Sequence, residues 1–168
     1  MPTSLLLLAD THLPKRAKQL PAAVWQAVAA ADVVFHAGDW VNLALLDELT
    51  ERANRLIGVV GNNDGEALRA RLPEVTHEII DGVRFALVHE TGASTGREKR
   101  MDATFSDIDV LIFGHSHIPW DTVTPAGIRL LNPGSPTDRR RQPFATMITA
   151  VADAGTLRDV TLIRLSTP

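Results

Sequence analysis

The chain has 168 residues, 45% of them hydrophobic, so it can bury a substantial core unaided, and we expect a single domain over residues 1–168. It contains no cysteine, which excludes disulfides, thiolate metal sites and a cysteine nucleophile and is compatible with the cytoplasmic location that we expect. Its 17 basic and 20 acidic residues leave a formal net charge of -3, so no global positive field favours nucleic acid or an anionic membrane as a partner.

Short apolar runs alternate with helical patterns up to residue 60. The apolar runs cover residues 5–9, 33–37 and 56–60, and the helical patterns cover residues 21–30 and 42–52. Pro21 suits the first turn of one helix, and Asn42 can cap the other. The alternation predicts βαβ units and a largely parallel sheet. The run 5–9 is too short for a signal-peptide core or a membrane span, so we read it as a buried strand.

Beyond residue 70 the pattern favours antiparallel strands. Asp81-Gly82 joins the runs 75–80 and 83–88, and this dipeptide is a strong hairpin signal because type I′ turns need positive φ at both central positions. Two further hairpins are expected, one from 120–124 with 128–131 and one from 144–151 with 157–165. A helix is expected within 91–105 and a buried strand over 110–113. The pattern predicts a mixed α/β fold of two packed sheets with helices outside.

Residues of metal-ligand type follow five of the predicted buried strands. They are Asp10 and His12 after 5–9, Asp39 after 33–37, Asn62, Asn63 and Asp64 after 56–60, His89 and Glu90 after 83–88, and His115 and His117 after 110–113. Because α/β folds bind ligands beyond the carboxyl ends of their strands, we expect these side chains to converge. Residues two apart in an extended chain share a face, so Asp10 pairs with His12 and His115 with His117.

Seven of these groups exceed what one tetrahedral ion needs, and four of the six histidines are among them. The seven are Asp10, His12, Asp39, Asn62, His89, His115 and His117. Two divalent ions sharing a carboxylate would use the set well. Oxygen and imidazole donors favour borderline ions such as manganese, iron, zinc or cobalt over calcium, without choosing among them. We expect Mn²⁺ first, with Fe, Zn, Ni, Co or Mg as alternatives. Glycines at 38, 61 and 114 would let the backbone approach an ion or phosphate closely.

These motifs resemble the calcineurin-like metallophosphoesterases, and in particular their small single-domain bacterial and archaeal phosphodiesterases, the YfcE-like group, over about residues 5–135. The resemblance implies a four-layer αββα sandwich of two mixed β-sheets flanked by helices, with the metal site at the carboxyl ends of the strands. It assigns one ion to Asp10, His12, Asp39 and His117, and has Asp39 bridge to a second ion held by Asn62, His89 and His115. The segment 132–135 (Asn-Pro-Gly-Ser) resembles the loop that closes the site.

The resemblance also implies an activity, the hydrolysis of small phosphate diesters by a hydroxide that bridges two ions. Asp64 would hold a ligand histidine by its free N–H. Two positions depart from the family pattern. Larger members carry a histidine that protonates the leaving group where this chain has Asn63, which cannot donate a proton. Relatives usually have glycine where this chain has Glu90, whose carboxylate could orient His89, bind an ion weakly or limit access.

Two other function classes stay open. The resembled superfamily includes a retromer subunit that works mainly by binding other proteins, so a non-catalytic scaffold is the first alternative. The intact ligand set argues against it, and Glu90 is the feature that keeps it open. A nuclease is the second, and the acidic balance and the lack of a basic, aromatic-rich patch argue against it. The expected partner is a small phosphate ester, with no membrane partner and a homo-oligomer as an option.

Two further positions have a functional and a structural interpretation. Arg139, the first of three consecutive arginines, could steer a phosphate into the site or lie on a solvated loop. His36 lies inside the predicted strand 33–37, where a histidine is more often a satisfied buried group than a ligand.

Overall fold

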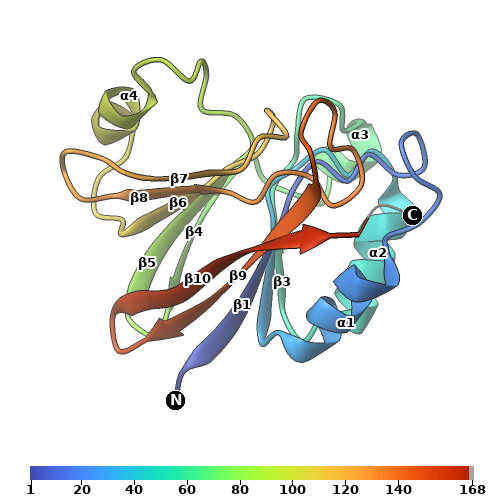
Figure 1. Ribbon diagram of the computed structural model, residues 1–168, viewed down its shortest axis with the longest axis horizontal. Helices are drawn as coiled ribbons and strands as arrows, with labels where there is room; N and C mark the ends of the chain where they lie inside the picture. The colour runs from blue at the N-terminus through green and yellow to red at the C-terminus, as the bar shows by residue number, and fades with distance from the viewer. Residues whose placement is uncertain (167–168) are drawn as a thin grey trace.

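The computed structural model describes residues 1–166, whose strands form two five-stranded sheets that face each other (Figure 1). The first sheet, of order β10-β9-β1-β2-β3, contains β1 (Thr3–Leu8), β2 (Val33–His36), β3 (Leu56–Gly58), β9 (Ala145–Asp153) and β10 (Thr156–Leu165). The second, of order β4-β5-β6-β8-β7, contains β4 (Val75–Ile80), β5 (Val83–Val88), β6 (Val110–Ile112), β7 (Trp120–Val123) and β8 (Arg129–Asn132). Each sheet mixes parallel and antiparallel pairs.

Helices cover the outer face of each sheet. On the first sheet lie α1 (Ala22–Ala30) and α2 (Leu43–Arg52), and on the second lies α4 (Arg97–Thr104) (Figure 1). The helix α2 begins where the sequence predicts, because the Asn42 side chain accepts a hydrogen bond from Ala44 N at 2.7 Å and satisfies one of the free N–H groups of the first turn. The predicted αββα sandwich is confirmed.

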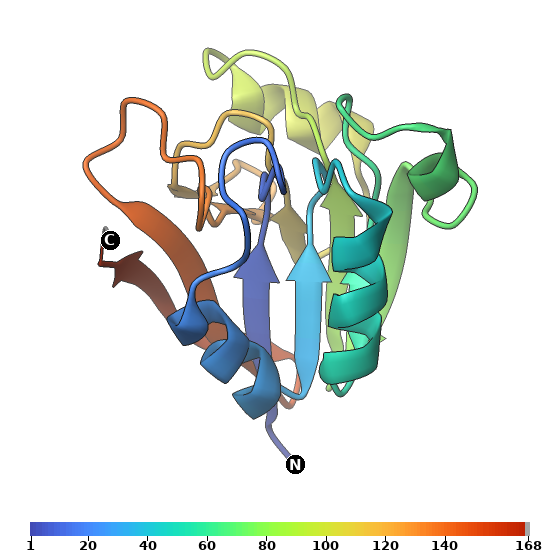
Figure 2. The same cartoon turned by 90° about the vertical axis from the view of Figure 1, so that its right-hand side faces the viewer.

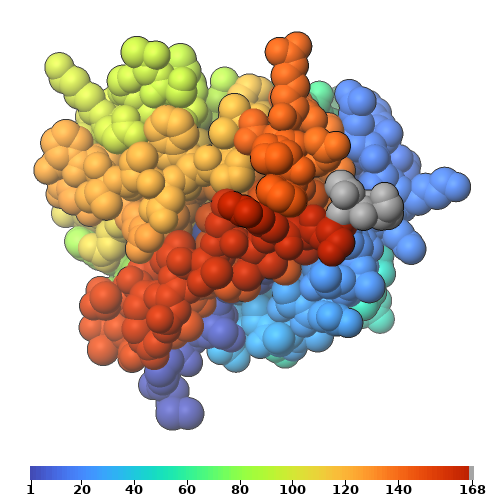
Figure 3. Space-filling view, in the orientation of Figure 1, coloured from blue at the N-terminus to red at the C-terminus, as the bar shows by residue number. Residues whose placement is uncertain are grey.

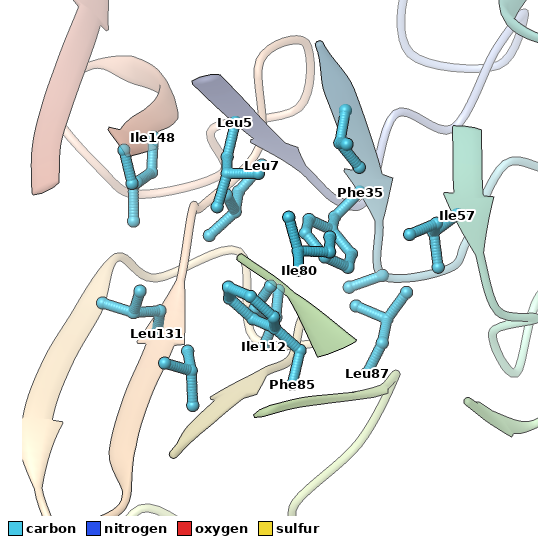
Figure 4. Packing of buried hydrophobic residues seen from close by; sticks show 14 of the residues in the cluster. Leu5, Leu7, Phe35, Ile57, Ile80, Phe85, Leu87, Ile112, Leu131 and Ile148 are labelled. Atoms are coloured by element: carbon cyan, nitrogen blue, oxygen red, sulfur yellow. The ribbon is translucent and has the colours of Figure 1, made fainter. Parts of the chain in front are cut away.

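The four consecutive leucines of β1 explain why the sequence shows no polar alternation there. Leu5 and Leu7 face the second sheet, where they pack in one cluster with Phe35, Phe85 and Ile112 (Figure 4). Leu6 and Leu8 face the helices on the other side. A strand buried on both faces reads as a continuous apolar run. The rings of Phe35 and Phe85, whose centroids are 5.2 Å apart, join the two sheets at the centre of the core.

The three predicted hairpins are present, and two of their turns have positive φ at both central positions. Asp81 and Gly82 have φ values of +46° and +79°, and Ala154 and Gly155 have values of +47° and +83°. The hairpin β9–β10 crosses the surface in Figure 3 (red), with β10 at the edge of its sheet. Because β9 pairs antiparallel with β1, the first sheet is mixed rather than largely parallel. Sequence periodicity cannot reveal this strand pairing. The single turn α3 (Glu66–Arg69) was not predicted.

The parallel strands place their carboxyl ends at one end of the sandwich. In Figure 2, β1 and β2 (blue) point toward the same group of loops. The loop after each strand therefore begins at a common edge, which is where the ligand-type residues were expected. No helix within residues 1–166 is long and apolar enough to cross a membrane.

Candidate metal centre

The loops after β1 and β2 hold each other through their main chains. Asp10 N donates to Gly38 O at 3.0 Å, and His12 N donates to Asp39 O at 3.0 Å. These bonds continue the parallel pairing of β1 and β2 past the ends of the strands. They fix Asp10, His12 and Asp39 relative to one another before any ligand is bound.

Further hydrogen bonds connect these loops with the second sheet. His115 N donates to Asp10 Oδ1 at 3.2 Å, and Gly114 N donates to His89 O at 2.9 Å. Ser135 Oγ, from the segment 132–135, donates to Asp10 O at 2.8 Å. Loops from both sheets thus form one hydrogen-bonded framework, in which the segment 132–135 is bound to the main chain of Asp10.

The first group of donor atoms surrounds Asp10. His12 Nε2 lies 4.0 Å from Asp10 Oδ1 and 3.3 Å from Asp39 Oδ2, and His117 Nε2 lies 3.8 Å from Asp10 Oδ1. The donor atoms of Asp10, His12 and His117 all lie within 4.8 Å of one another. This spacing suits one ion coordinated at about 2.0–2.2 Å by each donor.

The second group lies on the other side of Asp39. His89 Nε2 is 3.4 Å from Asp39 Oδ2 and 2.9 Å from Asn62 Oδ1. His115 Nδ1 is 3.1 Å from Asn62 Oδ1 and 3.3 Å from His89 Nε2. All seven predicted ligands are therefore brought together, and Asp39 Oδ2 lies between His12 and His89. Asp10, Asp39 and His89 also form a close set, so the geometry permits either carboxylate to be shared.

Three buried donor atoms at this site lack a hydrogen-bond partner: Asp10 Oδ2, His12 Nε2 and His117 Nε2. A buried polar atom without a partner costs about 1–3 kcal/mol, so proteins rarely retain one without a reason. His117 Nδ1 donates to Asp138 O at 2.6 Å, which leaves the lone pair on Nε2 facing the site. A divalent cation accepts all three lone pairs, so the residues present fit a metal ion.

Electrostatics favour a cation as well. Burial raises the pKa of Asp10 to about 7, although attraction to His89 and His12 partly offsets this effect. Burial lowers the pKa of His117 to about 4, so this ring is neutral near pH 7. Burial alone would also raise the pKa of Asp39, but contacts with His12 and His89 lower it below its ordinary value. Burial alone would lower the pKa of His89, but contacts with Asp39 and Asp10 outweigh it and raise this pKa. The site thus combines a buried carboxylate that is costly to ionise with a neutral imidazole at His117.

Backbone strain gathers at the same place. Asp10, His12, Asp39, His115 and His117 have φ values of +55°, +46°, +60°, +74° and +62°. Residues other than glycine seldom adopt this left-handed region, and such strain clusters at functional sites. The surrounding hydrogen bonds hold these residues in place, which indicates that the donor geometry is built into the fold.

Asp64 supports this framework differently from the prediction. It was expected to hold a histidine ring, and this was wrong. Its carboxylate accepts hydrogen bonds from three main-chain N–H groups, those of Asp39 at 3.0 Å, Val41 at 2.7 Å and Gly61 at 2.7 Å. Asp64 therefore ties the loop after β2 to the loop after β3.

We expect Asp64→Asn to lower the free energy of unfolding by about 1–3 kcal/mol, because the new amide N–H₂ would face main-chain donors inside the protein. Urea denaturation of the metal-free protein measures this. The control is Glu66→Gln, an exposed position on the nearby α3, with an expected change within about 0.5 kcal/mol. Equal stability of the two variants would show that Asp64 does not anchor the loops.

The other predicted residues take varied positions. Asn63 N and Nδ2 donate to Asp39 Oδ1 at 2.9 Å and Oδ2 at 2.8 Å, so Asn63 orients the central carboxylate. Glu90 is exposed, with Oε1 3.6 Å from His115 Nε2. Arg139 donates to Gln142 O at 2.6 Å and lines a cavity of about 640 Å³ that none of the seven ligand-type residues lines. Its predicted role in steering phosphate has no support from this position.

His36 is buried and lies outside the ligand set, as expected. Its ring stacks on Trp40 at 3.7 Å between centroids, and Gly38 N donates to its Nδ1 at 3.2 Å. Its Nε2 lies 3.1 Å from Thr11 Oγ1. Burial lowers the pKa of His36 to about 3, so it is neutral. It holds Thr11 between Asp10 and His12, a supporting role that the sequence did not indicate.

A hollow of about 260 Å³ adjoins the second donor group. It is lined by Val60, Gly61, Asn62, Arg69, Glu74, Val88, His89 and Glu90. Arg69 donates to Gly61 O at 3.0 Å and to Asp64 O at 3.1 Å. Sequence reasoning missed Arg69, since an exposed arginine on a single helical turn gives no distinctive signal.

Comparisons with known proteins agree with this geometry. A family model described as the calcineurin-like phosphoesterase superfamily domain matches residues 4–155. A probable metallophosphoesterase of Methanothermobacter thermautotrophicus is 33% identical over 168 residues, covering 96% of this chain and 92% of the relative. A phosphodiesterase of Methanocaldococcus jannaschii is 29% identical over 126 residues, covering 66% of this chain and 71% of the relative. Vacuolar protein sorting 29 from Cryptosporidium parvum has a similar fold, with a TM-score of 0.79, 18% identity and 99% of each chain covered.

Proposed function

Because the chain belongs to the calcineurin-like phosphoesterase superfamily, we propose that it is a phosphodiesterase that hydrolyses small phosphate diesters with two divalent metal ions, Mn²⁺ first among them. The observation that carries this proposal is the convergence of seven donor residues, with Asp39 between the two groups. Three buried donor atoms of these residues have no hydrogen-bond partner. The M. jannaschii relative named as a phosphodiesterase supports the diester assignment.

In this proposal the seven residues form two ligand sets, one for each ion. Asp10, His12 and His117 would hold one, and Asn62, His89 and His115 the other, with Asp39 shared. The ions would supply Lewis acidity and lower the pKa of bound water toward neutrality. The chain itself keeps the donors apart in two groups, and Asn63 fixes the direction in which Asp39 presents its oxygens.

The preference for diesters rests on charge and on the missing proton donor. The hollow beside the second donor group contains the carboxylates of Glu74 and Glu90 and the single guanidinium of Arg69. Such surroundings disfavour a monoester, which carries one more negative charge than a diester near neutral pH. Asn63 cannot protonate a leaving group, so esters whose alcohols are good leaving groups should react fastest.

The test is metal-dependent turnover. Protein freed of metal by a chelator is incubated with bis(para-nitrophenyl) phosphate, and Mn²⁺, Ni²⁺, Zn²⁺ or Mg²⁺ is added singly. We expect no turnover without metal, recovery with at least one ion, and slower cleavage of para-nitrophenyl phosphate, the monoester with the same leaving group. Faster cleavage of that monoester, or of alkyl monoesters, would contradict the diester proposal.

A non-catalytic scaffold is the competing function, favoured by the fold likeness to vacuolar protein sorting 29. The complete donor set argues for the enzyme, because a scaffold has no need of unpartnered donor atoms inside the protein. The same assay separates the two functions. Absence of turnover with every ion, in protein shown to bind metal, would favour the scaffold.

A further inference from the structure

His115 differs from the other histidines of the second donor group and the first. The side chains of His89 and His117 are 6% and 0% exposed, whereas that of His115 is 41% exposed. It lies on a loop and has a φ of +74°. Its ring therefore has the least support from packing and needs another device to keep its orientation.

The ring nitrogens of His115 are also used in the opposite sense. In His89 and His117, Nδ1 is bound to a main-chain carbonyl, that of Ala37 at 2.7 Å and that of Asp138 at 2.6 Å, so Nε2 faces the site. In His115 it is Nδ1 that faces Asn62 Oδ1 and His89 Nε2. Its Nε2 points outward and must carry the proton if Nδ1 is to donate a lone pair.

The partner of that outward nitrogen is Glu90. Its Oε1 lies 3.6 Å from His115 Nε2, an ion-pair separation that is slightly longer than a hydrogen bond, and this nitrogen forms no hydrogen bond and no other ion pair within residues 1–166. In His89 and His117 a main-chain carbonyl accepts the hydrogen bond of the ring nitrogen that faces away from the site. No main-chain carbonyl of the loop after β6 is bound to the outward nitrogen of His115. A carboxylate that accepts the remote N–H of a ligand histidine fixes its tautomer and makes it a stronger donor.

We propose that Glu90 is a positioning residue, whose carboxylate holds the outer nitrogen of His115 so that the inner one is presented to the second metal ion. This inference rests on the two-metal function proposed above. It excludes the two other roles that the sequence left open within the site. Glu90 does not orient His89, whose Nδ1 is already bound by Ala37 O. It is not a ligand itself, because the His115 ring separates its Oε1 from the donor atoms.

The proposal predicts selective loss of one ion. Without Glu90 the His115 ring can rotate or change tautomer, so the second ion should bind more weakly while the first is unaffected. Losing an outer partner of this kind weakens metal binding by about 10–100-fold. Since Glu90 and His115 are both partly exposed, water competes for the contact and we expect the lower end, about tenfold.

The experiment titrates the metal-free full chain with Zn²⁺ against a chromophoric chelator and compares the wild type with Glu90→Ala, Glu90→Gln and Glu74→Ala. Glu74→Ala is the matched control, because Glu74 lines the same hollow but, among residues 1–166, forms an ion pair only with Arg69 and contacts no ligand histidine. We expect about tenfold weaker binding of the second ion in Glu90→Ala and an intermediate value in Glu90→Gln, whose amide oxygen can still accept the N–H. Glu74→Ala should bind both zinc ions with the affinities of the wild type.

A second readout reports on the ring directly. Long-range ¹H–¹⁵N spectra of the zinc-loaded wild type should show His115 with a protonated Nε2 and a metal-bound Nδ1, and Glu90→Ala should broaden or shift these signals alone. Unchanged zinc affinities and His115 signals in Glu90→Ala, with two ions bound by the wild type, would overturn this inference only. A wild type that binds fewer than two ions would overturn the two-metal function together with it.

Discussion

Replacement of Asp39 by Asn is expected to lower kcat/KM for bis(para-nitrophenyl) phosphate by about a thousandfold or more, equivalent to about 4 kcal/mol of transition-state stabilisation. Asp39 Oδ2 lies 3.3 Å from His12 Nε2 and 3.4 Å from His89 Nε2, so it is placed to serve as the donor that we propose the two ions share. An amide is neutral and offers a single acceptor atom. Its N–H₂ would also face the N–H donors of Asn63, which now bind both carboxylate oxygens.

The measurement pairs steady-state kinetics with metal content and thermal unfolding. Asp47→Asn is the control, because Asp47 lies exposed on α2, where it pairs with Arg71. It should retain full activity and bind as much metal as the wild type. If Asp39→Asn stayed folded, bound two ions and kept activity within about tenfold of the wild type, Asp39 would not be the shared ligand.

The sequence predicted the architecture well where local rules apply. Asp81-Gly82 marks a turn because few residue types accept positive φ at both central positions, whereas Ala154, which also has positive φ, gives no such signal. The leucines of β1 predict a strand buried on both faces. The pairing of β9 with β1 was not predicted, because an antiparallel partner more than a hundred residues away leaves no periodic signal near either strand.

The site was predictable because its residues follow strands whose ends meet. Asp10, His12 and Asp39 converge through main-chain hydrogen bonds that extend the pairing of β1 with β2. The convergence of these side chains was therefore accessible to sequence reasoning, whereas the residues that hold them in place were not. Asp64 was expected to contact a histidine ring, but a carboxylate that follows a glycine-rich loop finds main-chain N–H groups nearer.

Ring nitrogens mark another limit of sequence reasoning. Nothing in the pattern Gly-His-Ser-His indicates that His115 faces the site with Nδ1 and His117 with Nε2. Both residues have positive φ, so the difference arises from their partners: Asp138 O binds His117 Nδ1, whereas His115 Nδ1 lies against Asn62 Oδ1. The role proposed for Glu90 depends on it, so sequence reasoning could name Glu90 as unusual without choosing which histidine it serves.

Gly61→Ala is expected to lower kcat/KM by about a hundredfold, although Gly61 donates no ligand. A Cβ at this position would lie within 3.0 Å of Asp39 Oδ1, N and Cγ. The φ of Gly61 is not in the left-handed region, so the cost comes from the close approach and not from backbone strain. The Asp64 carboxylate holds the main chain of both Gly61 and Asp39, so the two loops can make room for the Cβ only by moving apart, which displaces Asp39 relative to the other donor residues. Displacing a reacting group by about 1 Å can cost a hundredfold in rate.

Gly65→Ala is the matched control for this close approach. A Cβ at Gly65 meets no atom within 4 Å, so only a small loss of helix capping at α3 is expected, below about 1 kcal/mol, with full activity. Kinetics, zinc affinity and urea unfolding of both variants separate displacement of Asp39 from general destabilisation. Because Gly61→Ala replaces none of the seven ligand-type residues, weak metal binding in a folded protein would show that the fit of Asp39 against the loop after β3 sets the donor geometry. Wild-type activity in Gly61→Ala would show that the loop yields, and that Asp39 is positioned by β2 alone.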